Sequence, residues 1–386
     1  MNTSFELIEP AENGAVIKVI GVGGCGGNAL EHMMVRGLSG VEFICANTDA
    51  QSLKRSSAPI QLQLGSTQTR GLGAGARPEV GRNAALSDRD RLVELIRGAD
   101  MLFITAGMGG GTGTGAAPVI AEIAKEMDIL TVAVVTKPFL FEGTQCMKVA
   151  QAGIEELAKK VDSLIVVPNE KLRQVLGKVT FKDARAAAND VLYNAVSGIA
   201  EVIHTSGDIN VDFQDVRTVM GEVGMAMMGS ATARGADRAR NAAEAAVKSP
   251  LLEDVNLKGA HGVLVNITAS SDFDLDELYE TMETIREFTA EDAMVLFGQV
   301  TDESMGDNLR VTIIATGLDS AARQRQPKLE VVETVLERTG TDGGPASDAI
   351  DYDQPTVTRR RVGAPGSSAA SFDASDIPAF LRKQAD

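Results

Sequence analysis

The chain has 386 residues, of which 44% are hydrophobic and 4% aromatic, and it contains no tryptophan. This length predicts two domains, with cores built from Ala, Val, Ile, Leu and Met. The net charge of −16 argues against general affinity for nucleic acid or for an acidic membrane surface. Cys25, Cys45 and Cys146 have neither metal-site nor disulfide-framework spacing. The N-terminus lacks a signal-peptide core, and no apolar run is long enough to span a membrane. We therefore expect a soluble, cytoplasmic protein.

Apolar runs alternate with helix-like segments through the first half of the chain. The pattern predicts strands at 15–20, 41–47, 100–106, 130–136 and 163–167, with helices at 87–97, 116–125 and 142–160 and a first helix ending near residue 37. Such alternation is typical of α/β proteins, whose parallel sheet is covered by helices on both faces.

A long helix is expected from about residue 183 to 204, apolar around much of its circumference, as in a helix wedged between two domains. Beyond it, strands at 262–268, 293–297 and 309–315 and a helix at 275–288 predict a smaller α+β domain. The predicted boundaries are an N-terminal extension at 1–14, a Rossmann-like domain at 15–182, a central helix at 183–205 and the second domain at 206–318.

The last part of the chain changes in composition. Residues 339–371 are rich in Gly, Pro, Ser, Thr and charge, which predicts a disordered linker over 319–372. In the final segment, 373–386, the apolar cluster Ile377-Pro378-Ala379-Phe380-Leu381 lies beside Arg382 and Lys383. Such a peptide can fold on a partner protein, although an unstructured tail remains an alternative.

A glycine-rich segment, Gly109 to Gly115, follows an apolar run and precedes a helix-like stretch. Glycines allow the backbone to approach an anion closely, and a helix N-terminus adds a partial positive charge. Thr112 and Thr114 carry hydroxyls that can donate to phosphate oxygens. The loop contains no lysine, and no GxxxxGK[ST] pattern occurs in the chain, which excludes an ordinary P-loop enzyme. We therefore expect a phosphate bound mainly by backbone and hydroxyl groups.

An earlier glycine pattern, Gly21-x-Gly23-x-x-Gly26, fits the dinucleotide-binding fingerprint, and Asp49 follows at about the position of a ribose-binding acid. Taken alone, this pattern predicts a nicotinamide-dependent oxidoreductase. That alternative leaves the loop at 109–115 unexplained. With a third glycine-rich loop at 71–75, the arrangement is better suited to a polyphosphate enclosed on several sides.

After the predicted long helix, Asn210, Asp212 and Asp215 place an amide and two carboxylates within six residues. Asp212 could cap a helix with Asp215 in its first turn. The same groups could orient and polarise a water molecule, and one capped loop could do both. The three histidines have no ligand spacing and are expected to be structural or exposed.

These residues together resemble the FtsZ family of bacterial tubulin-like cell-division GTPases. The segment 109–115 reads GGGTGTG, which is the tubulin-type signature. The resemblance covers residues 15–317 and the tail. Further motifs occur in the same order along the chain as in the family: Asn47-Thr48-Asp49, Thr136-Lys137-Pro138-Phe139, Phe141-Glu142-Gly143, Ala188-Asn189-Asp190, Asn210-Val211-Asp212-Phe213 and Asp376-Ile377-Pro378-Ala379-Phe380-Leu381-Arg382.

The resemblance implies a GTP/GDP site, with Glu142 on the ribose side, Asp190 reading the guanine edge and Ala76 near the γ-phosphate. The implied nucleotide-binding residues are Gly24, Cys25, Gly26, Gly27, Asn28, Gly75, Ala76, Gly109, Gly110, Gly111, Thr112, Gly113, Thr114, Gly115, Glu142, Cys146, Asn189 and Asp190. Asn210, Asp212 and Asp215 would complete the site of the next subunit, so that hydrolysis requires head-to-tail assembly. Mg²⁺ would be bound mainly through phosphates and water, with no protein ligand assigned.

The resemblance also implies a homopolymer at the mid-cell division site. The peptide 373–386 would bind division adaptors such as FtsA and ZipA, and would attach the filament to the membrane only indirectly. Three residues depart from the family pattern. Cys25 often corresponds to glycine, Cys146 to a nucleotide-contacting arginine and Arg185 to an aromatic that stacks on guanine. A guanidinium can also stack on a base. A GTP-binding filament protein with impaired turnover is therefore the alternative.

Overall fold

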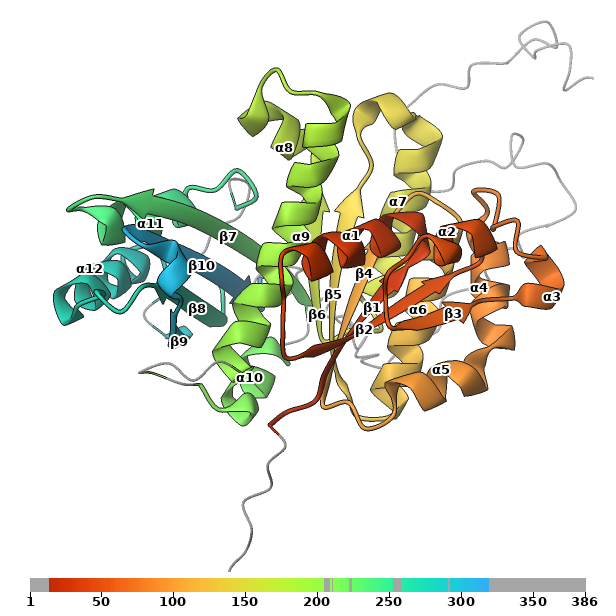
Figure 1. Ribbon diagram of the computed structural model, residues 1–386, viewed down its shortest axis with the longest axis horizontal. Helices are drawn as coiled ribbons and strands as arrows, with labels where there is room; N and C mark the ends of the chain where they lie inside the picture. Colours follow the sequence, from red (N-terminus) through yellow and green to blue (C-terminus); the bar gives the residue numbers. More distant parts are fainter. Residues whose placement is uncertain are drawn as a thin grey trace, which may run out of the picture. The chain divides into compact units, whose positions relative to one another are not determined.

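The computed structural model describes residues 14–204, 209, 211–221, 224–252, 259–290 and 292–318, all within one compact unit (Figure 1). The N-terminal extension, the linker at 319–372 and the peptide at 373–386 were predicted from the sequence and lie outside the described residues, except for residue 14. Within the described residues, no helix combines the length and apolarity needed to cross a membrane.

The first six strands form a parallel sheet in the spatial order β3-β2-β1-β4-β5-β6. Their bounds are β1 Ile17–Val22, β2 Val41–Asn47, β3 Ile60–Gln63, β4 Met101–Gly107, β5 Leu130–Lys137 and β6 Ser163–Pro168. Apart from β3 at the edge, the strands are apolar along most of their length because helices cover both faces of the sheet. The five strands predicted in this half are thus confirmed, and β3 was missed.

Successive strand residues alternate between two hydrophobic cores. Val19 of β1 packs in the core that includes α1 and α9, whereas Ile20 packs in the core that includes α4 and α6. The first core is formed with α1 Gly23–Val35, α2 Ala50–Lys54, α8 Asn169–Leu176, α9 Phe181–His204 and α10 Phe213–Met220; the second is formed with α4 Pro78–Ser87, α5 Arg89–Ile96, α6 Thr112–Glu126 and α7 Thr144–Leu157. A short helix, α3 Ser66–Thr69, precedes α4.

The second half of the fold continues the same sheet through β7, Gly224–Arg234, which the sequence analysis missed. Gly224 to Ala226 pair in parallel with β6, and the rest of β7 pairs antiparallel with β10, Asn308–Thr316. Beyond β10 lie β8 Gly262–Ala269 and β9 Met294–Thr301. Two helices, α11 Arg238–Val247 and α12 Leu275–Arg286, share a third hydrophobic core with β8 and β10.

Helix α9 connects the two halves. It packs against α1 in the first half and against β8, β9 and β10 in the second, which explains its nearly continuous apolar surface. In Figure 1 this helix runs from α8 at the top to α10 at the bottom. The predicted helix at 183–204 is therefore confirmed, beginning two residues earlier at Phe181.

Candidate functional site

Two glycine loops meet at the carboxyl edge of the parallel sheet, after β1 and after β4. Gly23 is the first residue of α1 and has φ +74°, a conformation that glycine adopts without strain. A Cβ atom on Gly23 would lie 3.1 Å from the backbone nitrogen of Gly113 in α6. The N-terminal turns of α1 and α6 therefore converge, and their unpaired N–H groups form the kind of site that binds phosphate.

The two threonines of the second loop have different environments. The hydroxyl of Thr114 is buried and accepts a 2.9 Å hydrogen bond from the N–H of Gly109, so it fixes the shape of the loop. Thr112 lies 2.6 Å, oxygen to oxygen, from the hydroxyl of Thr48. Of the two, only Thr112 lines the cleft described next.

A cleft of about 680 Å³ opens beside these loops, a size typical of small-molecule sites. It brings together many of the residues predicted from the sequence, namely Gly24, Cys25, Asn28, Ala76, Gly109, Gly110, Gly111, Thr112, Gly113, Glu142, Cys146 and Asn189. It does not include Gly26, Gly27, Gly75, Thr114, Gly115 or Asp190 among its lining residues.

Several of the residues outside the lining have evident structural positions. A Cβ on Gly26 would lie 2.4 Å from the carbonyl oxygen of Thr105, and one on Gly115 would lie 2.0 Å from that of Pro78. These positions allow α1 to pack on β4 and α6 to pack on α4. The loop at 71–75 reaches the cleft through Ala76, whose φ of +55° is unusual for a residue with a side chain. Such backbone strain is often found at ligand sites.

Asn169 was missed by the sequence analysis. It follows β6 at the carboxyl edge of the sheet, lines the cleft and is only 9% exposed. Its Oδ1 atom is buried and accepts no hydrogen bond from the described residues. Because buried amide oxygens are normally paired, this atom points to a ligand with an N–H or O–H donor. The sequence did contain one sign of this site, because Asn169 is a polar residue directly after a buried parallel strand.

Aromatic side chains form one wall of the cleft. The rings of Phe139 and Phe141 stack with centroids 5.1 Å apart, and the Phe181 ring meets Phe141 edge-on at 6.0 Å. The guanidinium of Arg185 lies 6.0 Å from the centroid of the Phe181 ring. This wall offers a flat apolar surface and a planar cation, which suit a nucleobase.

Cys25 and Cys146 are compatible with an anionic ligand. Cys25 lies within helix α1, where its backbone has no need for glycine, and its Sγ lies 3.7 Å from Oγ1 of Thr136. Burial is the main cause that raises the pKa of the Cys25 thiol, and burial followed by the nearby Glu142 raises that of Cys146. Both thiols are therefore protonated at neutral pH and place no negative charge next to a phosphate.

Glu142 and Asp190 already have partners. The Oε1 atom of Glu142 accepts a 2.9 Å hydrogen bond from the N–H of Phe139, which orders the short turn Leu140–Glu142 before α7. Asp190 of α9 accepts hydrogen bonds from His32 of α1 and from Arg36, the C-cap of the same helix. It is adjacent in sequence to Asn189, which lines the cleft.

The predicted carboxylates lie at the other end of the molecule's central helix. Asp212 caps α10, with Oδ1 accepting from the N–H of Gln214 at 3.2 Å, and Asp215 lies in the first turn. Both are exposed, and neither lines the cleft. Asn210 lies outside the described residues. Phe181 and Arg185, at the start of α9, line the cleft, whereas α10 follows the end of α9. Because a 24-residue helix spans about 36 Å, the carboxylates lie far from the cleft of the same subunit. The capping interpretation is confirmed, but it does not exclude a role at another subunit.

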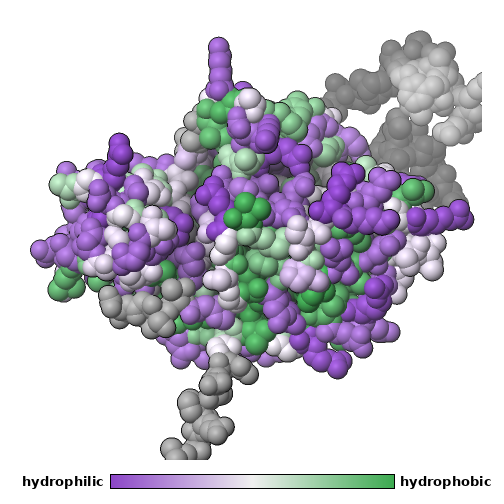
Figure 2. Space-filling model, in the orientation of Figure 1, coloured by the Kyte–Doolittle hydropathy of each residue, from purple (hydrophilic) through white to green (hydrophobic). Residues whose placement is uncertain are grey.

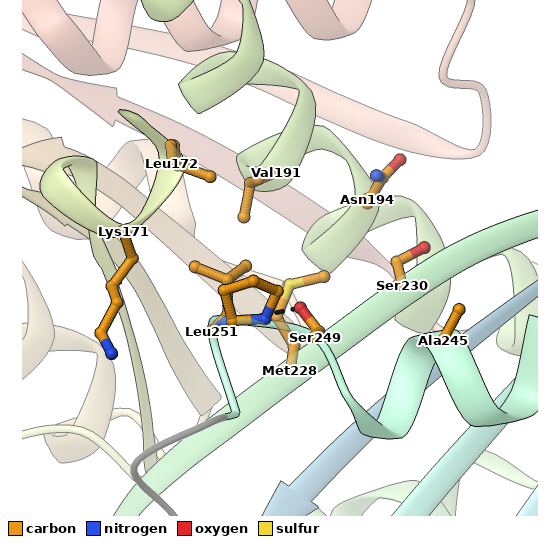
Figure 3. A pocket seen from close by; sticks show the side chains of 10 residues that line it. Lys171, Leu172, Val191, Asn194, Met228, Ser230, Ala245, Ser249 and Leu251 are labelled. Atoms are coloured by element: carbon orange, nitrogen blue, oxygen red, sulfur yellow. Dashed lines mark hydrogen bonds between the residues drawn. The ribbon is translucent and has the colours of Figure 1, made fainter. Parts of the chain in front are cut away.

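A second cavity of about 200 Å³ lies between α8, α9, β7 and α11 (Figure 3). Leu172, Val191, Met228 and Leu251 give it a largely apolar lining, and the N–H of Leu251 donates to Oγ of Ser249 at 3.4 Å. No glycine loop reaches it, so the cleft rather than this cavity fits a phosphate. Within the described residues, no group of three or more His, Cys, Asp or Glu side chains is placed to hold a metal ion.

Comparison with known proteins assigns the class. The family described as "Tubulin/FtsZ family, GTPase domain" matches residues 16–177, and "FtsZ family, C-terminal domain" matches residues 224–319. The fold and the cleft therefore define a tubulin-type GTPase, with both glycine loops in its GTPase domain.

Individual relatives narrow the assignment. The chain is 54% identical to cell division protein FtsZ of Azotobacter vinelandii and 55% identical to that of Pseudomonas aeruginosa, each over 99% of this chain and 100% of the relative. A structure titled "FtsZ dimer, empty" from M. jannaschii is 42% identical, with a TM-score of 0.77, over 80% of this chain and 90% of its own. This chain belongs to the FtsZ family of cell-division proteins. The oxidoreductase alternative is thereby excluded.

Proposed function

We propose that this tubulin-like GTPase hydrolyses GTP only between the subunits of a head-to-tail filament, with the α10 end of one subunit completing the nucleotide cleft of the next. Guanine-nucleotide binding and assembly into filaments for cell division follow from its family. The main support is the length of α9, which separates the cleft from the exposed Asp212. Because of this distance, the carboxylate of one subunit does not lie in the cleft of that same subunit.

The nucleotide is proposed to lie with its phosphates at the start of α1 and α6 and its base against the aromatic wall. Backbone N–H groups of the two loops and the hydroxyl of Thr112 would bind the phosphates. Asn189, Asp190 and the unpaired Oδ1 of Asn169 would contact the ribose and base. GDP would occupy the same site after loss of the γ-phosphate.

Hydrolysis is proposed to depend on Asp212 and Asp215 of the adjoining subunit, together with Asn210. An exposed carboxylate near the γ-phosphate can orient a water molecule and accept its proton as the water attacks the γ-phosphorus. The bond from that phosphorus to the oxygen bridging to the β-phosphate breaks, and GDP and phosphate leave. Mg²⁺, when bound, would neutralise phosphate charge. The only carboxylate in the described lining of the cleft is Glu142, so the ligands of Mg²⁺ would be mainly phosphate oxygens and water.

The alternative of a filament that binds GTP but turns it over poorly is not favoured. Cys25 occupies a helical position that accepts a side chain, and both cleft thiols are neutral. Arg185, the third departure, lines the cleft beside Phe181, where a guanidinium can stack on a base. None of the three departures is one of the proposed carboxylates.

The test is an Asp212→Ala variant of the full chain, with phosphate release and light scattering followed in parallel. Phosphate release is expected to fall at least a hundredfold, as for loss of a general base, while GTP binding and scattering persist. An Asp90→Ala variant, which removes an exposed carboxylate from α5, should behave as wild type. Unchanged turnover in Asp212→Ala would refute the assignment.

The C-terminal peptide 373–386 is proposed to bind division adaptors such as FtsA or ZipA, placing the filament at mid-cell and linking it to the membrane indirectly. Its apolar cluster next to two cations supports a docking role. A chain ending at residue 372 should retain GTP turnover and lose adaptor binding in a co-sedimentation assay. Retained adaptor binding would contradict the proposal.

A further inference from the structure

We infer that His32 and Arg36 are positioning residues that select guanine by fixing the carboxylate of Asp190. This inference rests on the proposed function, in which Asp190 reads the edge of the base. It adds a role for α1, a helix whose N-terminal turn lies at the phosphates.

Both hydrogen bonds to Asp190 end on the same oxygen. Nε2 of His32 lies 2.8 Å from Oδ1, and Nη2 of Arg36 lies 2.5 Å from the same atom. Arg36 is the C-cap of α1 and lies one helical turn after His32, so the two residues present their donors from the same side of the helix end. Among the described residues, no donor to Oδ2 is found. Oδ2 is therefore available to a ligand.

The hollow that His32 lines adjoins the nucleotide cleft. This hollow, of about 460 Å³, shares Asn28, Phe181, Arg185 and Asn189 with the cleft. The shared residues include Phe181 and Arg185 of the aromatic wall. Asp190 lines neither hollow but follows Asn189, which lines both, so a base that stacks on the wall is proposed to direct its edge toward the Asp190 carboxylate.

Guanine presents two donors on one edge, the N1–H and the 2-amino group, and a carboxylate is the matching acceptor. Loading Oδ1 with an imidazole and a guanidinium restrains the carboxylate rotation and leaves Oδ2 for the base. Hypoxanthine lacks the 2-amino group and adenine lacks both donors. A fixed carboxylate therefore favours GTP over ITP and ATP.

The experiment compares GTP and ITP binding to full-length wild type, His32→Leu/Arg36→Met and Asp190→Ala, below the concentration at which filaments form. The double variant is expected to lose about tenfold in GTP affinity, the usual effect of one charged hydrogen bond, with a much smaller loss for ITP. His32→Gln/Arg36→Lys, which retains a donor at both positions, should restore part of the GTP preference. Arg89→Met, which removes a cation paired with Glu126 elsewhere in the domain, is the matched control.

The possible outcomes distinguish a failure of this inference from a failure of the proposed contact between Asp190 and the base. If GTP and ITP affinities fall by the same factor in the double variant, the two residues serve the fold only and the inference is wrong. If Asp190→Ala alone changes the GTP-to-ITP ratio, Asp190 reads the base without help from α1, and the inference is again wrong. If Asp190→Ala leaves the ratio unchanged, the proposed base contact itself fails. A reduced ratio in both variants supports the inference.

Discussion

At the scale of single residues, the proposed nucleotide cleft contains a buried polar atom that has no hydrogen-bond partner among the described residues. This atom is Oδ1 of Asn169. Leaving such an acceptor unpaired costs free energy in the empty protein. A bound ligand that donates a hydrogen bond to this oxygen would remove that cost.

Replacing Asn169 by Leu should therefore separate stability from binding. We expect the nucleotide-free Asn169→Leu variant to gain about 1 kcal/mol in the free energy of unfolding, because the unpaired amide oxygen is removed. GTP affinity should fall about tenfold. Denaturant unfolding and nucleotide titration provide the two measurements. Asn194→Leu, which changes an amide in the second cavity, should leave GTP affinity unchanged. Lower stability with unchanged GTP affinity would contradict the assignment.

At the scale of secondary-structure elements, α11 and α12 are joined by a buried ion pair. Arg238 is 6% exposed, and its Nε and Nη2 donate to the two carboxylate oxygens of Glu277 at 2.6 and 3.0 Å. Its Nη1 lies 3.2 Å from Asp272. The hydrogen bonds to Glu277 are the main cause that raises the pKa of Arg238, so its charge is fixed.

Arg238→Met should destabilise the protein by about 3 kcal/mol, because it leaves the partly buried Glu277 without its counter-charge. Arg240→Met is a matched control on the same helix. Arg240 is 62% exposed and pairs with Glu244 at 3.3 Å, so its loss should cost less than about 1 kcal/mol. Equal destabilisation of the two variants, measured by denaturant unfolding, would show that the buried pair adds nothing.

The surface also differs between elements. In Figure 2 the face toward the viewer is mainly hydrophilic at its sides, and apolar residues interrupt it near its centre. Two of the exposed apolar residues line the cleft: Phe141 and Phe181 are 68% and 60% exposed. Apolar side chains at the rim of a site that another subunit is proposed to complete would be covered on assembly.

At the scale of the whole molecule, α9 separates the cleft from the carboxylates, so turnover should depend on assembly. We expect GTP hydrolysis per subunit to approach zero on dilution and to rise steeply above a threshold concentration. Binding of a fluorescent GTP analogue should persist below that threshold. Parallel phosphate release and light scattering across concentration provide the measurement. A constant rate per subunit at every dilution would show that one chain holds a complete catalytic centre.

Much of the fold was predictable because its patterns are local. The apolar runs at β1, β2, β4, β5 and β6 and the long periodic stretch of α9 stand out in the sequence, and all were confirmed. β7 was missed because Gly224-Met225-Ala226-Met227-Met228-Gly229 has neither alternation nor β-branched residues. Its strand conformation depends on pairing with β6 on one side and β10 on the other.

The sequence by itself determined the class of protein and the positions of the glycine loops, because a glycine loop between a strand and a helix is encoded by adjacent residues. It also predicted a catalytic role for Asp212 and Asp215, which stays a prediction. Tertiary structure alone decided that Asn169 lines the cleft, that Asp190 is held by α1, and that Asp212 lies beyond the far end of α9. Contacts such as that of Asp190 with His32 and Arg36 join residues distant in the chain, so they arise from how the elements pack. The position of Asn169 left only one local signal, a polar residue at the end of β6.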